Sequence, residues 1–115
     1  MIDPEDTGDL RRDIARRLRR AREATDMNQL EYGRQAGLSQ PHYNLFEKGT
    51  RRLTIEAALD LCAAHQLTLD YLYRGDPSGL PYKLHERIKR NIEAERAAGT
   101  ADPASKKVRN GRAKV

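Results

Sequence analysis

The sequence predicts an all-α fold, and three observations support that prediction. Apolar residues recur at helical spacings, as in Leu10, Ile14 and Leu18. Residues that cap or stop helices stand between the periodic segments. No segment alternates apolar and polar residues in the manner of a strand. With 115 residues, the chain has room for one compact domain with short flanking segments.

Three helices are expected in the first half of the chain. The first covers residues 10–25, and Asp9 or Asp6 can cap it. The second begins after Asn28, which stands three residues before Glu31, the spacing of a capping box. The third covers residues 39–48.

The connection between the second and third helices is short. Gly37 can adopt the left-handed conformation that ends a helix. Ser39 is a suitable N-cap, and Pro41 falls in the first turn, where its missing N–H costs nothing. Gly49 stops the third helix. These residues predict two helices joined by a tight turn.

Further helices follow the third one. Thr54 caps a fourth helix over residues 55–65, whose apolar stripe is expected to consist of Ile55, Ala58, Leu59 and Cys62. A short fifth helix follows Thr68, and residues 75–79 then break the pattern with glycine and proline. A sixth helix is expected over residues 80–98, with an apolar stripe formed by Leu80, Leu84, Ile88 and Ile92.

Four segments are therefore predicted. Residues 1–9 form a flexible acidic arm, and residues 10–76 form the main domain. Residues 80–98 form the additional helix, whose stripe either contacts a second copy of the chain or packs on its own domain. Residues 99–115 carry five basic residues, one acidic residue and no apolar pattern, so they are expected to be a disordered basic tail.

Charge and composition narrow the class of protein. The net charge is +5, and residues 10–53 hold eleven basic but five acidic residues, which indicates a polyanionic partner or a solvated basic surface. No run approaches the length of a membrane span, and the acidic N-terminus lacks the pattern of a signal peptide. The single cysteine, Cys62, forms no disulfide framework, so a reducing cytoplasm is expected.

The sequence offers no sign of catalysis. Cys62 lies within an apolar stripe, as a buried small hydrophobic residue would. The three histidines, His42, His65 and His85, lack metal-ligand spacing, and the last two are expected on the surface. No glycine-rich phosphate loop is present, so neither an enzyme nor a metal or other cofactor is expected.

The helix pair at residues 28–48 has the length and the glycine-containing turn of a helix-turn-helix. The stretches NQLEYGRQAGLSQ (28–40), YNLFEKG (43–49) and LDYLYRG (69–75) resemble the lambda-repressor-like, xenobiotic-response-element helix-turn-helix family. The resemblance covers roughly residues 10–76. It implies a five-helix DNA-binding domain that commonly works as a dimer on double-stranded DNA.

The resemblance also implies roles for individual residues. Residues expected to face bases are Gln40, Pro41, His42, Asn44 and Leu45. Residues expected to lie by the DNA backbone are Gln29, Ser39, Lys48, Thr50, Arg51 and Arg52. The chemistry agrees, because glutamine can bond adenine N6 and N7 together and leucine can contact a thymine methyl group.

One ion pair is expected inside the domain, between Arg22 and Glu47. The family commonly joins the ends of the first and third helices in this way, and the periodicity agrees. Arg22 follows Leu18 by four residues, and Glu47 follows Tyr43 by four, so both lie toward the inward faces of their helices. A charge on an inward face is costly without a partner.

Three functions remain open at this point. The leading interpretation is a transcriptional regulator, a repressor that binds a palindromic operator as a homodimer. A second is an antitoxin that binds DNA and neutralises a partner toxin through residues 81–115. A third is an interaction module that uses the helix-turn-helix only as a scaffold.

Overall fold

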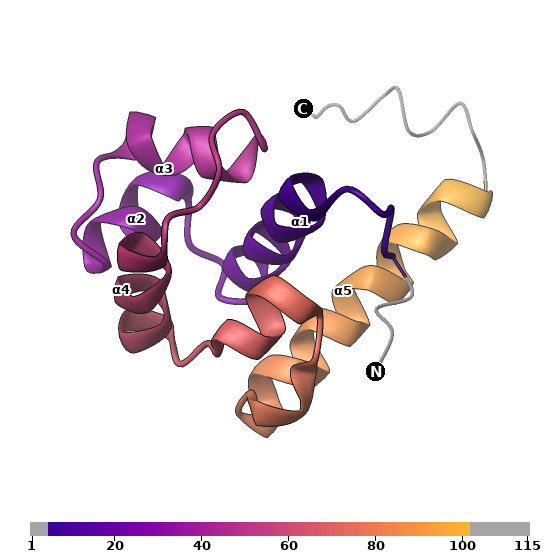
Figure 1. Ribbon diagram of the computed structural model, residues 1–115. Coiled ribbons are helices and arrows are strands. Elements are labelled where there is room, and N and C mark those ends of the chain that lie inside the picture. Colours follow the sequence, from indigo (N-terminus) through magenta and orange to yellow (C-terminus); the bar gives the residue numbers. More distant parts are fainter. Residues whose placement is uncertain (1–4, 102–115) are drawn as a thin grey trace.

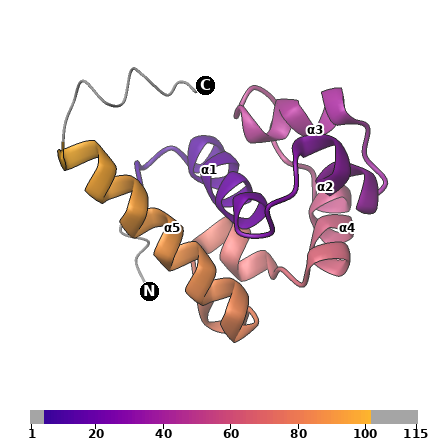
Figure 2. The same cartoon turned by 180° about the vertical axis from the view of Figure 1, so that it is seen from behind.

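The computed structural model describes residues 5–101, and within that range the chain is helical and has no strand. The elements are α1 (Leu10–Glu23), α2 (Gln29–Gln35), α3 (Gln40–Glu47), α4 (Ile55–His65), the π-helical turn η1 (Asp70–Arg74), the short turn η2 (Pro77–Gly79) and α5 (Tyr82–Ala101). Helix α1 lies in the middle, with α2, α3 and α4 on one side and α5 on the other (Figures 1 and 2). The all-α prediction is confirmed. Across the same range, no helix is both long and apolar enough to cross a membrane.

The first four helices begin where the sequence places their caps. In each case the side chain of the N-cap residue accepts a hydrogen bond from the backbone N–H three residues later, and the caps are Asp9, Asn28, Ser39 and Thr54. Such a bond satisfies one of the donors that every helix start leaves free. These caps fix the register of α2 and α3 and hence the direction of their side chains.

The core gathers around α1. Its largest fully buried side chains come from five elements and are Leu18, Tyr32, Tyr43, Phe46, Leu61 and Leu72. The rings of Tyr32 and Tyr43 lie 5.7 Å apart at an angle of 59°, which joins α2 to α3. The core therefore holds α3 against both α1 and α2.

Helix α5 packs on its own domain. Ile88 is 4% exposed, and Leu84 and Ile92 are partly buried against the same core. Arg87 also donates to the carboxylate of Asp26, at 2.9 and 3.0 Å, at the turn after α1. The apolar stripe thus has a partner within the chain and is not left free for a second copy. The expected basic tail begins as the last turn of α5, since that helix runs to Ala101, and its remainder, residues 102–115, lies outside the described residues.

The acidic residues before α1 have specific partners. Glu5 forms ion pairs with Arg16 and Arg20, and Asp6 forms one with Arg17. The side chains of Arg17 and Arg20 are almost fully buried. Part of the arginine-rich face of α1 is therefore neutralised by residues 5 and 6, so these two residues do not form the flexible arm that was expected there.

The stripe predicted for α4 is confirmed at Ala58 and partly at Cys62, but it is wrong at Ile55 and Leu59. Ile55 and Leu59 are 53% and 51% exposed, and the buried face combines Ala58 with Ala57, Leu61 and His65. Helix α4 carries apolar residues on most of its circumference, so spacing alone does not choose its inward face.

His65 lies in the protein interior, not on the surface as expected. Its ring stacks on Tyr32 with centroids 3.6 Å apart and planes 4° apart. Its Nε2 donates to the backbone oxygen of Tyr32 at 2.9 Å, because a carbonyl oxygen can only accept. Burial lowers the pKa of His65 below its ordinary value, although the hydrogen bond partly opposes this. His65 is therefore held neutral and joins α4 to α2.

This burial predicts a loss of stability on acidification. With its pKa lowered in the folded state, His65 binds a proton more readily in the unfolded chain, so protonation favours unfolding. The free energy of unfolding should fall as the pH drops below about 6.5, the ordinary pKa of histidine. Urea unfolding at pH 7.5 and pH 5.5 measures this fall. It should shrink in His65→Gln and persist in His85→Gln; an equal fall in all three proteins would assign it to other groups.

Gly33 is required where α2 crosses α3. A Cβ at this position would lie 3.0 Å from Tyr43 Cβ and 3.3 Å from Tyr43 Cγ. Tyr43 is fully buried and cannot easily move aside. Gly33→Ala gains about 1 kcal/mol of helix propensity but overpacks this contact, which costs about 1–3 kcal/mol.

We expect Gly33→Ala to lower the free energy of unfolding by about 1 kcal/mol on balance, since overpacking outweighs propensity. Urea denaturation measures the change. Arg34→Ala, at the neighbouring exposed position, is the control and should leave stability nearly unchanged. A Gly33→Ala variant more stable than the parent would show that Tyr43 has room to move.

Candidate nucleic-acid interface

The turn between α2 and α3 is tight. Gly37 has φ +79°, the left-handed conformation that glycine adopts without strain, and Leu38 N–H donates to Gly33 O at 2.8 Å. Ser39 then caps α3. This arrangement holds two short helices in fixed relative orientation, as a helix-turn-helix requires.

Helix α3 separates buried from accessible side chains. Tyr43 and Phe46 face the core and are 0% and 2% exposed. All residues expected to face bases are at least partly accessible: Pro41 and His42 are exposed, whereas Gln40, Asn44 and Leu45 are partly buried. The His42 ring leans on Phe46, with centroids 4.9 Å apart. The α3 surface thus offers one accessible face whose polar groups are Gln40, His42 and Asn44.

The structure contains the expected pair between Arg22 and Glu47. Arg22 Nε donates to Glu47 Oε2 at 2.6 Å, and Nη2 donates to Oε1 at 3.1 Å. Glu47 also accepts from the hydroxyl of Tyr43 at 2.6 Å. The pair joins the end of α1 to the end of α3 in the bidentate geometry that suits arginine. It fixes how α3 is tilted on the domain.

Glu47 stays ionised in this setting. Burial by itself raises the pKa of its carboxyl group, but hydrogen bonds from Arg22, Tyr43 and Gln29 outweigh burial and lower the pKa below its ordinary value. An ionised carboxylate has no proton to give and can only accept. Every group bonded to Glu47 must therefore present a donor to it.

A glutamine relay links this carboxylate to the accessible face of α3. Gln29 Nε2 donates to Glu47 Oε1 at 3.0 Å, and Gln40 Nε2 donates to Gln29 Oε1 at 2.9 Å. Gln29 was expected to lie by the DNA backbone, and its bond to Gln40 is a contact that the sequence did not predict. Gln29 and Gln40 are the first residues of α2 and α3, a shared position that could have signalled the contact.

The relay determines the orientation of both amide groups. Because Glu47 accepts only, Gln29 must turn its NH2 group toward Glu47 and its oxygen toward Gln40. Gln40 must then donate one of its two N–H groups to Gln29. It keeps its Oε1 and a second N–H, so it presents one acceptor beside one donor. A cavity of about 520 Å³ lies beside these two glutamines.

The segment after α3 supplies exposed basic groups. Lys48, Thr50, Arg51 and Arg52 are all exposed. The backbone N–H groups of Thr50 and Arg51 both donate to Leu45 O, at 3.1 and 3.2 Å, which holds this segment close to α3. Positive charge thus lies next to the accessible face of α3.

The comparisons with known proteins agree with this geometry. Residues 18–72 match the protein-family model described as "Helix-turn-helix". No curated protein and no solved structure matched the chain. The match begins within α1 and ends within η1, so it includes the α2–turn–α3 unit and the elements packed around it.

These findings identify a DNA-binding domain of the helix-turn-helix class. Domains of this class serve in transcription regulation. Over residues 18–72 the chain is similar to the lambda-repressor-like, xenobiotic-response-element family of helix-turn-helix regulators.

Proposed function

We propose that the protein is a cytoplasmic repressor that binds a palindromic operator as a homodimer, with α3 of each copy in the major groove. The observation that carries this proposal is the orientation of Gln40. Its amide lies on the accessible face of α3, and the relay through Gln29 to Glu47 sets the order of its donor and acceptor. A preset donor and acceptor side by side suit the reading of a base edge.

Adenine is the base that Gln40 fits. Gln40 Oε1 can accept from adenine N6–H, and its remaining N–H can donate to N7. Guanine presents O6 and N7, which are both acceptors, so O6 would face Gln40 Oε1 without a hydrogen between them. We therefore propose that the base contacted by Gln40 is adenine.

The other residues of α3 divide between reading and positioning. Asn44 and His42 add polar contacts to bases, while Leu45 and Pro41 offer apolar contact, which favours a thymine methyl group. Ser39, Thr50 and Arg51 lie at the two ends of α3, where they contact the DNA backbone. Backbone contacts fix the register of α3 on the duplex and carry no sequence information.

The contact between copies requires a surface other than the stripe of α5. Ile55 and Leu59 lie one turn apart on α4 and are about half exposed. We assign the dimer contact to this pair. Leu59→Glu should then weaken dimerisation, whereas Leu10→Glu should not, although Leu10 is 49% exposed. Sedimentation equilibrium distinguishes the two variants.

Selection of binding sites from random DNA, followed by footprinting on the best site, tests the proposed function. We expect two half-sites in inverted repeat, about one helical turn or roughly 34 Å apart, with an adenine at one position of each half. A single asymmetric half-site would contradict the homodimer. A selection without any sequence preference would contradict base reading altogether.

A further inference from the structure

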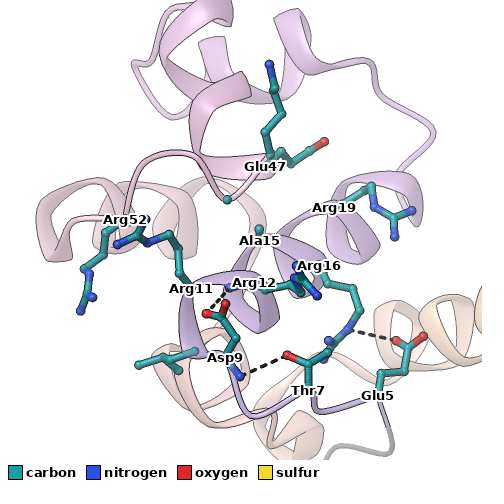
Figure 3. A pocket seen from close by; sticks show the side chains of 13 residues that line it. Glu5, Thr7, Asp9, Arg11, Arg12, Ala15, Arg16, Arg19, Glu47 and Arg52 are labelled. Atoms are coloured by element: carbon teal, nitrogen blue, oxygen red, sulfur yellow. Dashed lines mark hydrogen bonds and ion pairs between the residues drawn. The ribbon is translucent and has the colours of Figure 1, made fainter.

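A cavity of about 930 Å³ is lined by residues of α1, the end of α3 and the loop that follows it (Figure 3). Residues 5–9 close it from below. Its charged lining consists of six basic residues, Arg11, Arg12, Arg16, Arg19, Lys48 and Arg52, and of three acidic ones, Glu5, Asp9 and Glu47. The basic residues come from two elements that are far apart in sequence.

The three acidic side chains are engaged elsewhere. Glu5 pairs with Arg16 and with Arg20. Asp9 accepts from the backbone N–H of Arg12 and so serves the start of α1 (Figure 3). Glu47 is bound by Arg22, Tyr43 and Gln29. Their negative charge is therefore directed at the protein's own groups.

Four of the basic residues have no such partner. Arg16 pairs with Glu5 and Asp13, and Arg19 pairs with Glu23. Within residues 5–98, no acidic side chain forms an ion pair with the exposed side chains of Arg11, Arg12, Lys48 and Arg52. Cations gathered at one cleft repel each other and favour an anion between them.

We propose that this cleft binds phosphate groups, namely those of the DNA backbone that passes the end of α3. This inference rests on the proposed function and extends it, because it adds Arg11 and Arg12 of α1 to the loop residues Lys48 and Arg52. Arginine suits a phosphate because its planar fork donates two parallel hydrogen bonds. A small phosphorylated ligand shares this chemistry, and the experiment below distinguishes the two sources.

The test uses two double variants of the full chain. Arg11→Gln with Arg12→Gln removes two charges from the cleft. Arg74→Gln with Arg90→Gln removes two exposed charges outside it and serves as the control. Affinity for the selected operator is measured across a range of salt concentrations.

If both arginines contact backbone phosphates, the slope of log affinity against log salt should fall by about 0.9 for each lost contact, hence by roughly 1.8 for the cleft variant. The control should change it much less. The selected sequence should stay the same, because phosphate contacts carry no sequence information.

A second measurement titrates the DNA-free protein with inorganic pyrophosphate and follows the backbone amide signals of Arg11 and Gly49 by NMR. Saturable shifts that vanish in the cleft variant, together with an unchanged salt slope, assign the site to a small phosphorylated ligand. An unchanged slope and no such shifts overturn the proposal. Pyrophosphate binding by a protein that selects no DNA sequence would overturn the proposed function and leave the cleft as a phosphate site.

Discussion

Glu47→Ala is expected to cause the largest loss of stability of any single change considered, about 3 kcal/mol in the free energy of unfolding. The Glu47 side chain is 4% exposed, and its removal leaves the partly buried guanidinium of Arg22, which is 17% exposed, without its carboxylate. Arg22 keeps one bond to Met27 O, at 3.0 Å, which sets the loss at the lower end for a broken buried pair. The hydroxyl of Tyr43 also loses its acceptor.

Urea unfolding measures this loss, with Glu93→Ala on the exposed face of α5 as the control, which should change stability by less than about 0.5 kcal/mol. A double-mutant cycle adds a second readout. Arg22→Met with Glu47→Leu should cost clearly less than the sum of the single changes, since it leaves no stranded charge. Additive losses would mean that the pair contributes nothing as a pair.

The same change should also weaken DNA binding in the protein that remains folded. Without Glu47, Gln29 has no fixed acceptor, so its amide and that of Gln40 can turn over freely. Specific affinity should then fall more than affinity for unrelated DNA. A ratio of specific to non-specific affinity equal to that of the parent would show that the relay does not orient Gln40.

Gln40→Ala should have the largest effect on recognition. Removing a bidentate glutamine is expected to cost about 1–3 kcal/mol on the best operator, or roughly 5- to 150-fold in affinity, and to relax the preference at one base pair. The fold should stay intact, because Gln40 is partly exposed and its hydrogen bond to Gln29 is the last step of the relay.

Fluorescence anisotropy with the selected operator measures this change, and Gln35→Ala, an exposed glutamine of α2, is the matched control. Variants of the operator at each base pair show where the preference relaxes. If Gln40→Ala leaves the preferred sequence unchanged, the register assigned to α3 is wrong.

The helix-turn-helix could be predicted from the sequence because its signals are local. The caps at Asn28 and Ser39 and the left-handed Gly37 depend only on residues within a few positions of them. The Arg22–Glu47 contact was also expected, because the resemblance to the family implies it and helical periodicity places both residues on inward faces.

The failures concern contacts between distant segments. Periodicity groups Ile55 and Leu59 with Ala58 on one stripe of α4, but it cannot tell that stripe from the one formed by Ala57, Ala58 and Leu61, because both are apolar. His65 is a polar residue, so it was expected on the surface; its stack on Tyr32 and its hydrogen bond to Tyr32 O hold it in the interior.

The sequence also did not show which segments pair with the apolar stripe of α5, with the arginines of α1 or with the two glutamines. The stripe of α5 suited a second copy as well as its own α1, and the structure pairs it with α1. From the sequence alone, residues 5 and 6 and the arginines of α1 were expected to be exposed to solvent. The fold brings them together in ion pairs. The Gln29–Gln40 bond likewise depends on how closely α2 and α3 cross at Gly33.

The most direct test of the central claim is a crystal structure of the protein bound to its selected operator. It should show α3 in the major groove, with Gln40 Oε1 accepting from adenine N6 and Gln40 Nε2 donating both to adenine N7 and to Gln29. An α3 that lies outside the groove, or a Gln40 amide that points away from the bases, would contradict the account.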